Sequence, residues 1–142
     1  MKNILAALLL AFMACKSDPI TPDTAKLDSD FIIKKDETSR VDGLLLKFVD
    51  VKEDSRCPLN VNCIRAGNVQ VNLKINDNES ASFCLGDCNI SNPTRYSKFV
   101  EQDAQEITTG GKKYLFTLKA VNPYPGTTPS TPYEIKMQVS RK

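Results

Sequence analysis

The residues with the most distinctive chemistry in this sequence are its five cysteines. Cys57 and Cys63 have a C-x5-C spacing, Cys84 and Cys88 have a C-x3-C spacing, and Cys15 stands apart near the N-terminus. Four thiols in an oxidising compartment can form two disulfides. Because partners close in sequence bracket turn-forming residues, we favour the pairs Cys57–Cys63 and Cys84–Cys88. A crossed pairing that would link the two clusters stays open.

The same residue types argue against metal and nucleophilic chemistry. Neither cysteine pair has the C-x2-C spacing that is usual in structural zinc sites and in redox-active disulfides. The chain has no histidine, which is the usual general base near neutral pH and the usual transition-metal ligand. Ser-His-Asp and Cys-His catalysis are therefore excluded, whereas Ser-Lys dyads and carboxylate pairs are not. We expect no catalytic residue, no metal and no cofactor.

Cys15 has the position of a lipid attachment site. It follows an apolar run of ten residues, Ile4–Met13, which is far too short to cross a bilayer, since a helical crossing takes about 20 residues. The run fits the apolar region of a secretory signal. Ala14 is the small residue expected before a lipidated cysteine, whereas Phe12 stands where leucine is usual. We expect residues 1–14 to be a signal peptide and Cys15 to carry the lipid.

The rest of the chain divides simply into a tether and a domain. Residues 15–26 begin with the lipidated cysteine and continue as a polar stretch with two prolines, typical of a flexible tether. A lipid anchor at Cys15 makes the membrane of the bacterial cell envelope the first partner, and the outer membrane, periplasmic or surface-facing, is the expected address. Residues 27–142 have the length of one domain. The formal net charge of +2 suggests no nucleic-acid partner.

The domain shows the patterns of short β-strands. Candidate strands are Phe31–Lys35, Leu44–Val51, Asn68–Ile75, Ser80–Leu85, Lys113–Val121 and Tyr133–Ser140. Apolar and polar residues alternate most clearly in Asn68–Ile75 and Tyr133–Ser140, which indicates one buried and one solvated face. In Lys113–Val121, the expected inward residues are Tyr114, Phe116, Leu118 and Ala120. Leu44–Val51 is apolar with blurred alternation, which suggests burial on both faces or a bulge.

Turn signals separate these candidate strands. Asp42-Gly43, Asn76-Asp77-Asn78 and Gly110-Gly111 supply residues that tolerate positive φ. The one segment that could be helical is Ser97–Glu106, and its pattern is poor. About six or seven short strands predict an all-β fold, a small antiparallel β-sandwich or barrel-like fold with disulfide-stapled loops.

The run D-S-R-C-P-L-N-V-N-C-I-R-A-G, from Asp54 to Gly67, is the most distinctive motif. It resembles the motif D-S-R-C-P-x-x-x-x-C-x-x-A-G of a family of uncharacterised bacterial lipoproteins. That family also has a later strand that runs into N-P-Y-P, as Asn122–Pro125 does here. The resemblance implies a fold and an envelope address, but no activity and no catalytic residue. Arg65 stands where the family has an aromatic residue, often tryptophan.

The residues of the motif favour a structural role. Arg56 carries five donors in a rigid fork, which suits a carboxylate or loop carbonyls. Pro58 fixes φ after the cysteine, and Gly67 permits a bend or a positive φ where the next strand begins. A stapled loop is therefore favoured over ligand binding for this segment.

A second loop, Asn122–Pro132 (NPYPGTTPSTP), is the candidate binding loop. It contains Tyr124 and Pro125, and Tyr133 lies just beyond it. Proline-rich loops lose little entropy on binding, and tyrosine is favoured at contacts. A stiff hairpin connection is the simpler interpretation of the same residues.

These features predict a membrane-anchored, non-enzymatic binding or envelope-structural module with a protein or glycan ligand. Two alternatives stay open: an Ig-like protease inhibitor that uses residues 122–132, and a carboxylate-dependent hydrolase. A composite binding surface would require that the two cysteine loops and residues 122–132 gather at one end of the domain.

Overall fold

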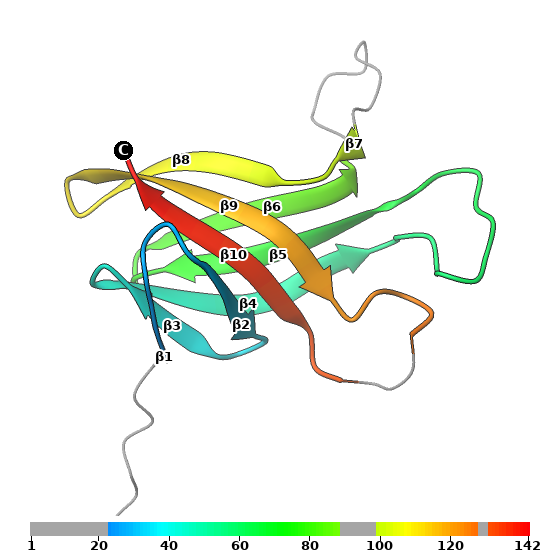
Figure 1. Ribbon diagram of the computed structural model, residues 1–142, viewed down its shortest axis with the longest axis horizontal. Helices are drawn as coiled ribbons and strands as arrows, with labels where there is room; N and C mark the ends of the chain where they lie inside the picture. Colours follow the sequence, from blue (N-terminus) through cyan, green and yellow to red (C-terminus); the bar gives the residue numbers. More distant parts are fainter. Residues whose placement is uncertain (1–22, 89–98, 128–130) are drawn as a thin grey trace, which may run out of the picture.

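The computed structural model describes residues 23–88, 99–127 and 131–142, which form two β-sheets (Figure 1). The larger sheet contains, in spatial order, β1 (Asp23–Ala25), β3 (Thr38–Val41), β4 (Leu44–Asp54), β5 (Asn68–Ile75), β6 (Glu79–Asp87) and β7 (Phe99–Val100). The smaller sheet contains β2 (Asp30–Lys34), β10 (Glu134–Arg141), β9 (Lys112–Asn122) and β8 (Asp103–Thr109). Within these ranges no helix is long and apolar enough to cross a membrane. The expected all-β, sandwich-like class is confirmed, with ten strands in the described residues rather than six or seven.

The core lies between the sheets and is built by the alternation read from the sequence. β5 buries every second side chain completely, namely Val69, Val71, Leu73 and Ile75. β10 contributes Ile135, Met137 and Val139 from the opposite sheet, and all three are also fully buried. Each such aliphatic side chain stabilises the fold by roughly 1.5–3 kcal/mol relative to an exposed one. The two clearest period-two patterns therefore form the two halves of the core.

Bulges explain where the alternation is interrupted. The β4–β5 register shifts between Phe48 and Asp50 and again further along, so the blurred pattern of Leu44–Val51 does mark a bulge. The β9–β10 register shifts where Lys119 lies between the paired residues Leu118 and Ala120. An extra residue reverses the facing of all that follow. The prediction that Ala120 points inward was therefore wrong: Val121 is buried in its place.

Two segments have a different structure from the one that their sequence suggested. The described part of Ser97–Glu106 is not helical, because it contains β7 and the start of β8. The first sheet begins at Asp23, in β1, which lies before the boundary at residue 27 and pairs in parallel with β3. The hydroxyl of Ser39 donates to the Asp23 carbonyl at 3.0 Å and fixes this pairing. The remaining strand pairs are antiparallel.

Side chains of β8 join the two sheets along one side. The Asp103 carboxylate accepts from the backbone N–H of Cys84 at 2.9 Å, and Gln105 donates to the Ser82 carbonyl at 2.8 Å. These bonds satisfy backbone groups along the outer edge of β6, which an open sheet would leave unpaired. The sandwich is thus partly closed, as a barrel would be.

The predicted turns are confirmed at the positions that required them. Asp42 and Gly43, between β3 and β4, both have positive φ, as do Asn76 after β5 and the pair Gly110–Gly111 before β9. Asparagine, aspartate and glycine are the residues that adopt this conformation at least cost. Local turn chemistry thus places three of the strand reversals.

Candidate functional site

Three chain segments gather at one end of the sandwich, at the right of Figure 1. They are residues 55–67 between β4 and β5, the segment after β9, and the end of β6 with Cys84 and Cys88. Leu59 N–H donates to the Pro125 carbonyl at 3.2 Å, and Asp87 N–H donates to the Gly67 carbonyl at 2.8 Å. We call this surface the loop end. The gathering that a composite binding surface would require is therefore present.

The guanidinium of Arg56 ties the loop end together. Arg56 is only 9% exposed. Its Nε and Nη2 donate to both carboxylate oxygens of Asp54 at 2.8 and 2.7 Å, a bidentate pair. Nη1 donates to the Val121 carbonyl at 2.7 Å, and Nη2 also donates to the Pro123 carbonyl at 3.0 Å. The expectation that Arg56 suits a carboxylate or loop carbonyls is confirmed for both, and we call this set of contacts the Arg56 clamp.

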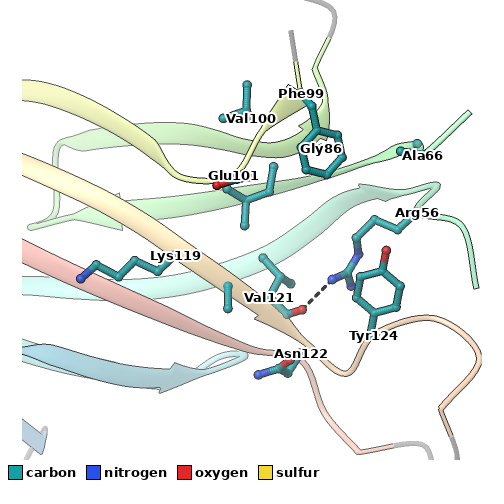
Figure 2. Close-up of a pocket in the computed structure, with 13 residues that line it drawn as sticks. Arg56, Ala66, Gly86, Phe99, Val100, Glu101, Lys119, Val121, Asn122 and Tyr124 are labelled. Carbon is teal, nitrogen blue, oxygen red and sulfur yellow. Dashed lines mark hydrogen bonds between the residues drawn. The ribbon is translucent and has the colours of Figure 1, made fainter. Parts of the chain in front are cut away.

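Two tyrosines complete the Arg56 clamp. The Arg56 guanidinium lies 4.6 Å from the ring centre of Tyr124, a cation–π contact that fixes this ring over the charge (Figure 2). The hydroxyl of Tyr133 donates to Asp54 at 3.1 Å. Both tyrosines of the candidate binding loop thus contact the ion pair. Pro125 accepts the hydrogen bond from Leu59, so the described part of this loop is held against the disulfide loop.

Tyr133 gives the clamp a pH dependence on the alkaline side. Burial raises the pKa of the Tyr133 phenol above its usual value, and the neighbouring Asp54 charge and hydrogen bond raise it further. A pKa raised by folding contributes stability that is present below the unfolded value, near 10, and is lost as the pH rises through the folded value. We therefore expect the stability of the wild type to fall above about pH 10, and Tyr133→Phe to reduce that slope. Urea unfolding at several alkaline pH values measures this slope.

Tyr114 provides the matched comparison for this measurement, because burial and Asp42 raise its pKa as well, at the other end of the sandwich. Tyr114→Phe should therefore remove a separate part of the alkaline slope. A Tyr133→Phe variant with an unchanged slope would show that this phenol is not held protonated by the clamp.

The disulfides are Cys57–Cys63 and Cys84–Cys88, the pairs favoured from their spacing. The Cα atoms are 5.9 and 6.0 Å apart. The first closes residues 57–63, directly after Arg56, and the second fixes the end of β6. Cys15 lies outside the described residues.

Removal of the first disulfide should destabilise the domain measurably. Closing a seven-residue loop is worth about 2 kcal/mol in the chain-entropy model. We expect Cys57→Ser with Cys63→Ser to lower the free energy of unfolding in urea by about that amount. The same double substitution at Cys84 and Cys88 is the comparison, with a similar expected loss. An unchanged urea midpoint would contradict a stabilising role for the Cys57–Cys63 disulfide.

A groove opens between the two sheets at the loop end (Figure 2). Its volume is about 290 Å³, and β7 and the end of β9 form its opposite walls. Its lining residues are Arg56, Ala66, Gly67, Leu85, Gly86, Phe99, Val100, Glu101, Lys119, Ala120, Val121, Asn122 and Tyr124. We call it the β7–β9 groove.

Apolar side chains are exposed at this end of the molecule. Among the described residues, four of the seven exposed large apolar side chains belong to the loop end, namely Leu59, Val61, Ile64 and Tyr124, and a fifth, Phe99, belongs to β7 at the groove. Ile64, directly after Cys63, is fully exposed. Contiguous exposed apolar residues mark interaction surfaces more often than isolated ones do.

The sequence indicated only part of this site. It singled out Tyr124, Pro125, Tyr133 and the cysteines, which do come together, except for Cys15. It missed the wall formed by Phe99, Val100 and Glu101, because a two-residue strand has no detectable periodicity. It also missed Ala120 and Val121 as groove residues, since the bulge at Lys119 is not visible in the pattern.

A metal site and similarity to known proteins are two further sources of functional evidence, and neither identifies additional residues in the described ranges. No group of three or more Cys, Asp or Glu side chains in the described ranges could hold a metal ion. No protein-family model, curated protein or solved structure matches the chain. The resemblance of Asp54–Gly67 to a lipoprotein motif therefore stays a prediction.

Proposed function

We propose that this chain is an exported lipoprotein, lipidated at Cys15 and anchored to the bacterial cell envelope, whose β-sandwich is a non-enzymatic binding module. The observation that carries the binding role is the loop end: separate segments held rigidly together around a groove, with exposed apolar side chains. A preorganised surface loses little conformational entropy when a partner binds. The two disulfides support an oxidising compartment, in agreement with an export signal at residues 1–14.

The charges at the groove favour binding over hydrolysis. A carboxylate-dependent glycosidase needs two carboxyl groups about 5–9.5 Å apart across the scissile bond. Glu101 is the only carboxylate among the described residues that line the groove. The nearby Asp54 is 8% exposed and is occupied by Arg56 and Tyr133. The described lining therefore offers no carboxylate pair of the kind that this alternative requires.

The inhibitor alternative receives less support than a groove or loop-end partner. An inhibitory loop must present its residues outward to a protease. The Tyr124 ring stacks on Arg56, and the Pro125 carbonyl accepts from Leu59 N–H, so the backbone of this part of the loop is held against the domain. Residues 128–130 of the same loop lie outside the described residues.

Two measurements test the proposed function. Mass spectrometry of the protein from membranes should find a chain that begins at a lipidated Cys15, and Cys15→Ser should release it from the membrane fraction. A photo-crosslinker at Val61, on the loop end, should give a discrete adduct in intact cells, whereas one at Ile32, on β2, should not. An intact Met1 would overturn the anchor, and equal crosslinking at both positions would overturn the binding role.

A further inference from the structure

β9 has an uncovered edge along the groove. On its β10 side it is paired from Tyr114 to Asn122, whereas on its β8 side it is paired only as far as Leu118, opposite Asp103. No described strand pairs with residues 119–122 on that side, and these residues line the groove. The β7–β9 groove therefore lies where a continuation of β8 would run.

This uncovered edge directs hydrogen-bond donors toward the groove. The N–H and C=O groups of a residue in an antiparallel ladder point to the same neighbour. The Val121 carbonyl points away from β10, to Nη1 of Arg56, so the Val121 N–H also faces the open side. Arg56 uses four of its five N–H groups on Asp54, Val121 and Pro123. The fifth, on Nη1, has no partner among the described residues.

The charges decide which acceptor suits these donors. The Arg56 charge is matched by its bidentate pair with Asp54, and the ammonium of Lys119 is bonded to Asp30 at 2.6 Å. The remaining charge at the groove is the carboxylate of Glu101, which would repel an anion. A neutral carbonyl oxygen is therefore the complementary group, because it accepts hydrogen bonds and brings no charge.

The side chains that line the groove indicate which class of molecule supplies that carbonyl. Leu85, Val100 and Val121 line the groove with apolar surface, which complements an apolar side chain of a peptide. A volume of about 290 Å³ is at the lower end for small-molecule pockets and suits one or two side chains of a peptide. Phe99, which is 56% exposed, and Tyr124 flank the opening.

We propose that the β7–β9 groove receives an extended segment of a partner protein as an added strand beside Lys119–Asn122. One large apolar side chain of that segment enters between Phe99 and Tyr124, and a backbone carbonyl accepts from Val121 N–H and from Arg56. Main-chain hydrogen bonds supply affinity and the groove supplies specificity, as in other cases of strand addition. This inference rests on the binding role proposed above and names its partner chemistry.

A tryptophan peptide provides a direct test, because the chain itself has no tryptophan. The probe is acetyl-TVWVT-amide, titrated with the full chain in mild detergent. Its fluorescence should shift to shorter wavelength and saturate as the indole enters the groove. Phe99→Ala should weaken this binding about fivefold or more. Ile32→Ala, at a similarly exposed residue on β2 (53%), is the matched control and should leave binding unchanged.

A second peptide tests the strand pairing itself. In this analogue an (E)-alkene replaces the amide after the tryptophan, which keeps the shape but removes both the carbonyl and the N–H of that amide. An ester at the same bond, which keeps the carbonyl and lacks only the N–H, is its control. Relative to the ester peptide, the alkene peptide should bind about fivefold more weakly or worse, because one net hydrogen bond is typically worth about that factor. Equal binding of the alkene and ester peptides would indicate an apolar pocket without strand pairing and would overturn the proposal, as would a failure to saturate. Crosslinking from Val61 does not involve the groove, so the proposed function is tested separately.

Discussion

Replacement of Arg56 by methionine is expected to lower the free energy of unfolding by about 3–5 kcal/mol, the usual cost of breaking a buried ion pair from one side. Methionine keeps much of the volume but removes all of the donors. The Asp54 carboxylate, 8% exposed, then loses its counter-ion, and the carbonyls of Val121 and Pro123 lose their donor. Such a loss is a large fraction of the roughly 5–15 kcal/mol that stabilises an ordinary domain.

Urea unfolding measures this loss as a lower midpoint at an unchanged slope. Arg65→Met is the matched control, because Arg65 belongs to the same connection between β4 and β5 but is exposed; it should change stability by no more than about 0.5 kcal/mol. Asp54→Asn combined with Arg56→Met should recover part of the loss, since no unpaired charge is left buried. Arg56→Lys should recover little, because an ammonium lacks the planar fork. An Arg56→Met variant as stable as Arg65→Met would refute the clamp.

Gly67→Ala is expected to be the second large effect, with a loss of about 3 kcal/mol or more. Gly67 has φ +68°, and a Cβ there would overlap the carbonyl oxygen of Ser55. A left-handed backbone costs an alanine about 1–2 kcal/mol. The overlap adds to this cost, because it pushes apart the strand ends where Ser55 N–H donates to the Asn68 carbonyl at 2.8 Å.

Gly110→Ala separates the two contributions. Gly110 has φ +58°, close to that of Gly67, but a Cβ there would meet nothing within 4 Å. It should therefore lose only about 1–2 kcal/mol. Thermal unfolding of both variants measures the difference, and the yield of folded protein serves if Gly67→Ala does not fold. Equal losses would show that the close approach of residues 55 and 67 has no energetic consequence.

Much of the core was predictable because its residues obey a local rule. In β5 and β10, alternation continues without interruption, so period two identifies the buried side chains. The cysteine pairs followed from short loops that need only local closure. The donor capacity of Arg56 was also readable from its chemistry, although its acceptors Val121 and Pro123 lie more than sixty positions away and no local pattern could name them.

β8 shows why the remaining fold was not predictable. Its partly buried positions include Asp103 and Gln105, so the sequence lacks the apolar alternation of a strand with one face in the core. Those polar residues are there because they bond to the edge of β6. The groove also depends on non-local features: a bulge at Lys119, a β8 that begins only at Asp103, opposite Leu118, and a very short β7 together create it.

The short parallel strand β1 has a mechanical consequence. In the lipid-anchored form proposed above, a pull on the domain would reach β1 first. Three residue pairs and the Ser39 hydroxyl bond hold β1 to β3 in the described residues, and of its side chains Ala25 alone packs against the core. A modest force would separate β1 from β3 and lengthen the segment between Cys15 and the domain by about 10 Å, at roughly 3.3 Å per residue. The sandwich then follows a moving partner while its core stays intact, because β1 detaches under load and pairs with β3 again when the load is removed.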